Sequence, residues 1–319
     1  MQFTIDKPSL TKALAHVTSV VERRNTIPIL SNVHLGTRNN ELKLTSTDLD
    51  MEIVETVPAR AKGEGATTVP AHMFHDIVRK LPEGSDIEIA RDGDQGRLTI
   101  SCGQARFSLQ TLTADDFPSL SVDDLGHAFT MPAADLKRLI EKTRFAISTE
   151  ETRYYLNGIY LHAAESRGKP VLRAVATDGH RLAQVELPLP AGAKDMPGVI
   201  VPRKTVAELA KLAENGDGDV RIELSPSKIR VTTARVVLTS KLIDGTFPDY
   251  ERVIPQGNDK TMEVDNHAFA EAVDRVSTLS SDKGRAVKLS ITDGKFTLPV
   301  HNPDSGSARE EIPVEYGFD

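Results

Sequence analysis

The sequence predicts an α+β fold in which one domain is repeated along the chain, each copy with two helices packed on antiparallel strands. Three observations lead to this prediction: a composition typical of globular proteins, sequence landmarks that recur at domain-sized spacing, and a helix and strand pattern that recurs with them. The 319 residues are 39% hydrophobic and 27% charged, which provides material for two or three domains.

The repeat is visible in motifs that return in the same order. FTIDKPSLTKALAHV (3–17) returns as FTMPAADLKRLIEKT (129–143), so that Ile5 and Leu10 have counterparts 126 residues later. Further landmarks keep nearly the same spacing: Thr47-Asp48 with Thr177-Asp178, Val69-Pro70 with Val201-Pro202, and Phe117-Pro118 with Phe247-Pro248. Four landmarks in one order indicate a duplicated domain.

A third copy begins at Met262, where MEVDNHAFAEAVDRV places Phe269 and Val273 at the positions of Leu136 and Ile140. Only 58 residues run from Met262 to Asp319, so we expect the third domain to be incomplete. The expected domains are 1–125, 126–253 and 254–319.

Each copy has the same order of elements. An amphipathic helix follows a short extended start, because apolar residues in 3–17 and 129–143 fall on one helical face. A second helix begins at Pro70 or Pro202, where a missing N–H is tolerated. Alternating apolar residues predict strands at 41–44, 51–54, 86–89, 97–101, 159–161, 172–176 and 221–224, and Asp-Gly pairs at 92–93, 244–245 and 293–294 supply turn chemistry.

Several classes of protein are excluded by what the sequence lacks. No run approaches the roughly 18 apolar residues of a membrane helix, and the N-terminal MQFTIDKPSL has no signal-peptide pattern. Cys102 is the single cysteine, which fits a reducing cytoplasm and excludes both an internal disulfide and a thiolate metal site. No HExxH motif or clustered metal-ligand spacing is present. We therefore expect a cytoplasmic protein that has no contact with membranes and needs neither a metal nor a cofactor.

The distribution of charge points to nucleic acid although the total charge does not. The formal net charge is −7, yet the helical segments 7–24, 71–82, 133–145 and 202–212 together carry +8, which leaves −15 on the rest of the chain. Helices facing one side would present a positive surface to a phosphate backbone. Because these helices hold no clear cluster of base-reading side chains, the contact would be independent of base sequence. The alternative is that Lys and Arg are simply good helix formers on solvated faces.

Long motifs resemble the bacterial DNA polymerase III beta subunits, the sliding clamps. They are TIPILSN (26–32), TTVPAHMFHDIVRKLPEG (67–84), RFSLQTL (106–112), ADDFPSL (114–120), RYYLNGIY (153–160), ATDGHRLA (176–183), VIVPRK (199–204) and SKLIDGTFPDYERVIP (240–255). The resemblance runs from Met1 to about Tyr316. It implies a head-to-tail homodimer of three similar domains per subunit, which forms a ring around double-stranded DNA with helices lining the hole.

The resemblance implies DNA contacts at Arg24, Tyr154, Tyr155, Arg203 and Lys204. Arg24 is expected in a polar turn, where an exposed charge with no partner is the plainer alternative. Tyr154 and Tyr155 are expected on a strand, where neighbouring side chains face opposite ways and at least one is exposed.

The resemblance also implies a groove that receives short hydrophobic peptides. The expected partners are the DNA polymerase III catalytic subunit, the clamp loader and other replication and repair proteins. The residues that it implies are Tyr155, Leu156, Thr177, Gly179, His180, Arg181, Leu182, Pro248, Arg252 and Val253.

Pairing between subunits in the family joins the first domain to the third. The residues that it implies are Arg106, Phe107 and Leu109 on one side, and Leu279, Glu310 and Glu311 on the other.

The leading hypothesis is a non-enzymatic processivity factor that encircles DNA and tethers the replicative polymerase. The alternative is a hydrolytic enzyme on the duplicated scaffold that uses Asp178 and His180. No GxSxG motif accompanies these two residues, so His180 is expected to have a binding or structural role. A protein-interaction scaffold that does not bind DNA is a third option.

Overall fold

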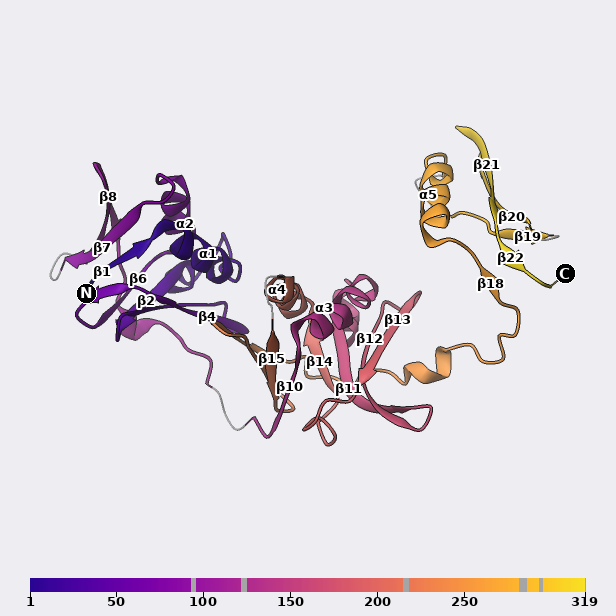
Figure 1. The fold of residues 1–319 in the computed structure, drawn as a ribbon, viewed down its shortest axis with the longest axis horizontal. Helices are drawn as coiled ribbons and strands as arrows, with labels where there is room; N and C mark the ends of the chain where they lie inside the picture. The colour runs from indigo at the N-terminus through magenta and orange to yellow at the C-terminus, as the bar shows by residue number, and fades with distance from the viewer. Residues whose placement is uncertain (93–95, 122–124, 215–217, 281–285, 293–294, 319) are drawn as a thin grey trace. The chain divides into compact units, whose positions relative to one another are not determined.

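The computed structural model describes residues 1–319 apart from 93–95, 122–124, 215–217, 281–285, 293–294 and 319. The chain divides into two compact units, Met1–Phe247 and Pro248–Asp319. The first unit holds two copies of one arrangement, and the second holds a related set of elements (Figure 1). The α+β class and the repeated domain are confirmed.

The first copy has a helix pair, α1 and α2, packed together over antiparallel strands. Asp6 caps α1 by accepting a hydrogen bond from the Ser9 amide at 2.9 Å, and Leu10, Leu14 and Val17 then face the core. Its elements are β1 (Gln2–Asp6), α1 (Lys7–Thr18), η1 (Pro28–Ser31), β2 (Asn32–Arg38), β3 (Glu41–Thr47), β4 (Met51–Pro58), β5 (Arg60–Lys62), β6 (Gly65–Pro70), α2 (Ala71–Lys80), β7 (Asp86–Asp92), β8 (Arg97–Cys102) and β9 (Ala105–Gln110), followed by η2 (Ala114–Asp116).

The second copy repeats this order with the helix pair α3 and α4. The expected helix starts at the Val-Pro motifs are nearly correct, because Pro70 and Pro202 are the last strand residues before α2 and α4. The elements of the second copy are β10 (His127–Pro132), α3 (Ala133–Glu141), η3 (Arg144–Ala146), η4 (Glu151–Leu156), β11 (Gly158–Ser166), β12 (Lys169–Thr177), β13 (Leu182–Pro188), β14 (Val199–Pro202), α4 (Arg203–Glu214), β15 (Asp219–Leu224), β16 (Lys228–Thr232) and β17 (Val236–Lys241).

One sheet joins the two copies. Its order is β10-β15-β16-β17-β4-β3-β2-β6, so half of its strands come from each copy and β17 pairs with β4 at the joint. In the antiparallel register of the joint, Leu238 lies opposite Ile53 and Val236 lies opposite Glu55. The other sheets of this unit are β5-β1-β7-β8-β9 and β13-β12-β11-β14. The first two copies therefore share continuous backbone hydrogen bonding and one hydrophobic core.

The second unit has its own small core around Phe296 and Leu298, both fully buried. Helix α5 begins with the same cap as α1, since the Asp265 side chain accepts from the Ala268 amide at 2.8 Å. The elements are η5 (Tyr250–Val253), β18 (Met262–Glu263), α5 (Asn266–Ser277), β19 (Ser290–Thr292), β20 (Lys295–Asn302), β21 (Gly306–Pro313) and β22 (Glu315–Tyr316), and the sheets are β18-β22 and β19-β20-β21.

One local prediction is wrong. Tyr154 and Tyr155 lie in the 3₁₀ helix η4, and the strand begins only at Gly158. Aromatic residues favour strands, but short i to i+3 hydrogen bonds such as Asn157 N–H to the Tyr154 carbonyl replace the strand ladder here.

Asp244-Gly245 lies in the loop after β17 and does not form a hairpin. A Cβ on Gly245 would lie 3.1 Å from the Tyr155 Cβ atom, so this loop packs closely against η4. The pairs at 92–93 and 293–294 extend outside the described residues.

Among the described residues, no helix has the length and apolar character needed to cross a membrane.

Candidate nucleic-acid interface and peptide groove

The residues expected to contact DNA come from three segments that meet at the junction of the two copies in the first unit. The Arg203 amide donates to the Asn157 carbonyl at 2.9 Å, which ties the start of α4 to the segment that carries Tyr154. Lys204 reaches Glu22, two residues before Arg24. Ser148, Asn157, Arg203 and Lys204 line a shallow cavity of about 420 Å³ on this surface.

The exposed side chains at the junction suit a phosphate backbone. Arg24 and Arg203 are exposed, and neither has an ion pair within the described part of the chain. The first turn of α4 contains no acidic residue, so the helix dipole adds to the positive potential there. Tyr154 is 53% exposed, whereas Tyr155 is half-buried.

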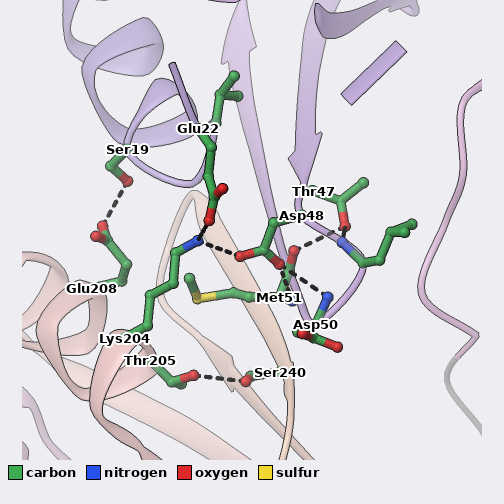
Figure 2. A network of polar contacts seen from close by, with 12 residues as sticks. Ser19, Glu22, Thr47, Asp48, Asp50, Met51, Lys204, Thr205, Glu208 and Ser240 are labelled. Carbon is green, nitrogen blue, oxygen red and sulfur yellow. Dashed lines mark hydrogen bonds and ion pairs between the residues drawn. The ribbon is translucent and has the colours of Figure 1, made fainter. Parts of the chain in front are cut away.

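Lys204 differs from these residues because it has two carboxylate partners. Its Nζ lies 2.5 Å from Asp48 Oδ2 and 3.2 Å from Glu22 Oε1 (Figure 2). Partial burial disfavours the charged ammonium, but the hydrogen bonds and the attraction from Asp48 and Glu22 outweigh burial and raise the pKa of Lys204. Its charge is therefore largely compensated within the chain.

Other helical cations are also paired, so the +8 of the helical segments overstates the free charge. Lys7 is buried and lies 2.5 Å from Glu83, and Lys211 lies 2.7 Å from Glu208. Several remain exposed without an ion pair in the described ranges: Lys12, Arg23, Arg24, Lys80, Arg138, Lys142, Arg144 and Arg203. The helices of both copies still contribute free positive charge.

In the first unit, most residues expected in the peptide groove lie on the hairpin loop between β12 and β13, residues 177–182, which we call the groove loop. Thr177 and Leu182 pair across the end of this hairpin. Leu182 is half-buried, and Leu156 is buried. Gly179, His180 and Arg181 are exposed, so the loop presents polar backbone and side chains above an apolar base.

Three further residues lie near this loop: Arg153, Glu150 and Phe145. A Cβ on Gly179, which has a φ of +90°, would come within 2.6 Å of Arg153 Nη1, so Arg153 lies directly against the loop. Arg153 is held in turn by Glu150, with Nε 2.7 Å from Oε2. The ring of Phe145 is 55% exposed and lies 5.7 Å from the Arg181 guanidinium carbon. The only sequence signal for Arg153 is its place in the motif RYYLNGIY. No sequence signal indicates that Phe145 is exposed.

Asp178 holds this loop together and has no visible role in catalysis. Its Oδ1 accepts hydrogen bonds from the amides of His180 and Arg181, at 2.9 and 3.0 Å, and its Oδ2 accepts from Arg181 Nε at 3.0 Å. The amide hydrogen bonds from Arg181 and His180 lower the pKa of Asp178. The carboxylate is thus engaged by the loop itself, which leaves the hydrolase alternative without support.

The remaining groove residues belong to the second unit. Pro248 and Arg252 are exposed, and Val253 in η5 is 69% exposed. Arg252 Nε lies 2.6 Å from Asp249 Oδ2.

Five of the six residues expected at a subunit interface lie on the last strands of two sheets. Arg106, Phe107 and Leu109 are on β9, the last strand of its sheet. Beside it is a hollow of about 490 Å³, lined by Phe107 and by residues of the α2 region, both apolar (Met73, Ile77, Leu81) and charged (Asp76, Lys80).

In the second unit, Glu310 and Glu311 are on the edge strand β21, and Leu279 packs partly against the core. The hydrogen bond from Arg275 lowers the pKa of Glu310.

No group of three or more His, Cys, Asp or Glu side chains suited to a metal occurs in the described part of the chain.

Family models match nearly the whole chain. The N-terminal domain of the DNA polymerase III beta subunit matches residues 1–121, its central domain matches 130–249 and its C-terminal domain matches 251–317. The chain belongs to the DNA polymerase III beta subunit family. The resemblance read from the motifs is confirmed.

Curated sliding clamps are similar over most of their length. The beta sliding clamp of Caulobacter vibrioides is 52% identical over 316 residues, which are 99% of this chain and 85% of that protein. The beta sliding clamp of Escherichia coli K12 is 41% identical over 319 residues, with the same coverage.

Solved clamp structures have the same fold. A Bartonella birtlesii sliding clamp bound to griselimycin has a TM-score of 0.95 and 52% identity over all of this chain and 85% of that chain. A Caulobacter crescentus beta sliding clamp has a TM-score of 0.97, with the same identity and coverage. This chain is accordingly a replication clamp of the beta subunit family.

Replacement of exposed arginines at the candidate DNA interface should weaken DNA binding without base preference. We expect Arg24→Ala and Arg203→Ala each to remove about one phosphate contact, which lowers the slope of log affinity against log salt by about 1. Fluorescence anisotropy on short duplexes of different sequence, over a range of salt, measures this slope. Lys169→Ala is the matched control, because Lys169 is exposed and pairs with Ser166, at the opposite end of β11 from Asn157 and the candidate DNA interface. An effect limited to one DNA sequence would reveal base readout instead.

Proposed function

We propose that two copies of this chain associate head to tail into a ring around double-stranded DNA, and that the ring acts as a non-catalytic processivity factor in the cytoplasm. The observation that carries the proposal is the pairing of β17 with β4 between the first two copies. Each of these two strands has an equivalent strand, β9 and β21 respectively, that lies at the edge of its sheet.

The first counterpart is β9. In the second copy, the ladder pairs Val231 with Leu238 as β16 meets β17. In the first copy, Ile100 pairs with Phe107 as β8 meets β9. Phe107 is thus the equivalent of Leu238, but β9 ends its sheet whereas β17 continues into β4. An unpaired edge with a half-buried aromatic residue favours addition of another strand.

The second counterpart is β21. The register of β20 and β21 places Leu298 opposite Glu310, as β3 and β4 place Leu44 opposite Glu55. The matched glutamates even have equivalent helical partners. His16 Nδ1 of α1 lies 2.7 Å from Glu55 Oε2, and Arg275 Nη2 of α5 lies 2.6 Å from Glu310 Oε1.

Pairing of β9 in one copy with β21 in another would repeat the internal joint, with Phe107 opposite Ala308. Each chain offers one edge of each kind, so two chains can pair in a closed head-to-tail arrangement. A closed ring also agrees with the distribution of charge. Because a ring holds DNA by enclosing it, it needs a positive surface toward the phosphates but no side chains that read bases.

The groove loop of the second copy suits short hydrophobic peptides. Leu156 and Leu182 supply apolar contact, and Arg181, His180 and Thr177 supply a polar rim. The family resemblance assigns Pro248, Arg252 and Val253 of the second unit to the same peptide-binding function. The proposed partners that carry such peptides are the DNA polymerase III catalytic subunit, the clamp loader and other replication and repair proteins. All of them would bind at the same groove.

An edge-strand variant tests subunit pairing. We expect Phe107→Asp to weaken the dimer at least about tenfold, because a carboxylate would be desolvated between paired strands. Sedimentation velocity over a concentration series measures the monomer–dimer equilibrium, and a melting curve checks that the variant is folded.

Lys62→Asp is the matched control, since it changes charge on β5, the opposite edge of the same sheet. A folded Phe107→Asp protein that dimerises as tightly as the parent would exclude β9 as the interface.

A further inference from the structure

The first copy contains a loop equivalent to the groove loop of the second. In the loop 177–182, Thr177 Oγ1 donates to the Arg181 carbonyl at 2.7 Å, and Asp178 Oδ1 accepts from two backbone amides. In the loop 47–51, Thr47 Oγ1 donates to the Met51 carbonyl at 2.9 Å. Asp48 Oδ1 likewise accepts from the amides of Asp50 and Met51, at 2.9 and 2.7 Å. The two loops are therefore built by the same hydrogen bonds.

The surroundings of the two loops correspond as well. Leu30 in η1 precedes β2 as Leu156 in η4 precedes β11, and both are buried. A cavity of about 500 Å³ lies beside the first loop, lined among others by Leu30, Met51 and Leu242. The junction of the first two copies thus contains a structural counterpart of the proposed peptide groove.

The two loops differ in how exposed their equivalent residues are. Met51 corresponds to Arg181, because each carbonyl accepts from the threonine four positions earlier. Arg181 is exposed, whereas Met51 is only 1% exposed. Figure 2 shows the side chain of Lys204, from the start of α4, extending past Met51 toward Asp48 and Glu22. The lysine comes from the second copy, and both carboxylates come from the first.

The contacts of Lys204 are part of a larger polar network across this junction. Ser19 Oγ in the first copy donates to Glu208 Oε2 in the second at 2.6 Å. Lys241 Nζ lies 2.9 Å from Asp50 Oδ1. Asp48 is the most enclosed of the carboxylates around Lys204, with a side chain 11% exposed, so its pairing is the least screened by solvent.

We propose that Lys204 is a positioning residue, which holds the second copy against the first at the loop equivalent to the groove loop. Only its consequence for DNA rests on the proposed function. Lys204 then acts on DNA through the angle between the two copies, and the phosphate contact at the start of α4 belongs to Arg203.

A double-mutant cycle tests the coupling. Lys204→Met keeps the length of the stem and removes the charge, and Asp48→Asn keeps the Oδ1 acceptor of the loop while it removes the negative charge. We expect each change to lower Tm by about 4 °C, and the two together to lower it by little more than either alone. Lys204→Arg should restore Tm, because its guanidinium can bridge both carboxylates.

Distance and salt measurements separate positioning from general stability. Spin labels at Arg38→Cys and Arg167→Cys, with Cys102→Ser to remove the native thiol, report the distance between the copies. We expect Lys204→Met to broaden the distance distribution and Lys204→Arg to leave it unchanged. We also expect Lys204→Met to keep the salt slope of DNA binding, whereas Arg203→Ala lowers it by about 1.

A Lys204→Met variant with unchanged Tm and distances, but a salt slope lower by about 1, would identify Lys204 as a phosphate contact and overturn the inference. That result would leave the proposed clamp function intact. If neither Arg24→Ala nor Arg203→Ala changed DNA binding, the proposed DNA interface would fail instead, and the double-mutant cycle would still decide the role of Lys204.

Discussion

We expect the protein, once loaded on circular duplex DNA, to remain bound at least about a hundred times longer than on the same DNA after linearisation. The exposed cations at the copy junction attract phosphates without reading bases, and interactions of this kind are weak and exchange rapidly at physiological salt. Retention must therefore come from enclosure, which a free DNA end abolishes. Gel filtration of labelled protein with closed and cut plasmid, after loading by the clamp loader, measures the difference.

The Phe107→Asp variant provides the control for enclosure. A protein that cannot close its ring should be lost equally fast from both DNA forms, although its basic side chains are unchanged. Equal long retention of the parent protein on circular and linear DNA would contradict a ring. Equal short retention would show that the ring does not close on DNA under these conditions.

The second large effect is expected at the groove loop, where Leu182→Asp should weaken peptide binding by at least about a hundredfold. A peptide with two or three apolar anchors should bind with an affinity on the order of micromolar, mostly through one or two buried anchors. A carboxylate at Leu182 loses apolar contact and adds a desolvation cost, together several kcal/mol. Calorimetric titration with a peptide from the polymerase catalytic subunit measures the loss.

Folding of the variant has to be checked, because Leu182 is half-buried at the start of β13. A melting curve close to that of the parent separates loss of the site from loss of the fold. Gln184→Asp introduces the same carboxylate at an exposed position two residues further along the strand, and it should retain most of the affinity. Undiminished peptide binding by a folded Leu182→Asp protein would remove Leu182 from the groove.

Much of the fold could be predicted because the signals were local and occurred more than once. The helical face of Leu10 and Leu14 recurs at Leu136 and Ile140, and both segments form helices that bury these residues. The Val-Pro motifs placed the starts of α2 and α4 within a residue. Where one short segment stood alone, as at Tyr154 and Tyr155, the preference of aromatic residues for strands was misleading.

The candidate site could be predicted as a set of residues but not as a set of contacts. Motifs identified Lys204, Arg203, Tyr154 and Leu182 as candidates, and the structure brings the first three to one junction. The partners of Lys204 could not be read from the sequence, because Glu22 and Asp48 lie 182 and 156 positions away. The count of +8 for the helical segments therefore includes Lys204 as an uncompensated charge, although it is paired with these two carboxylates.

The sequence alone determined the repeat, the class of the fold, the family and the segments that carry basic and apolar side chains. These properties depend on local periodicity and on motifs that stay recognisable wherever the chain folds. Only the tertiary structure decided that β17 continues into β4 whereas β9 ends its sheet, and that Asp48 of one Thr-Asp loop pairs with Lys204 of the other copy whereas Asp178 of its counterpart pairs with Arg181 of the same loop. Pairing of strand edges and compensation of charges depend on which distant segments meet, and that is set by the packing of the whole unit.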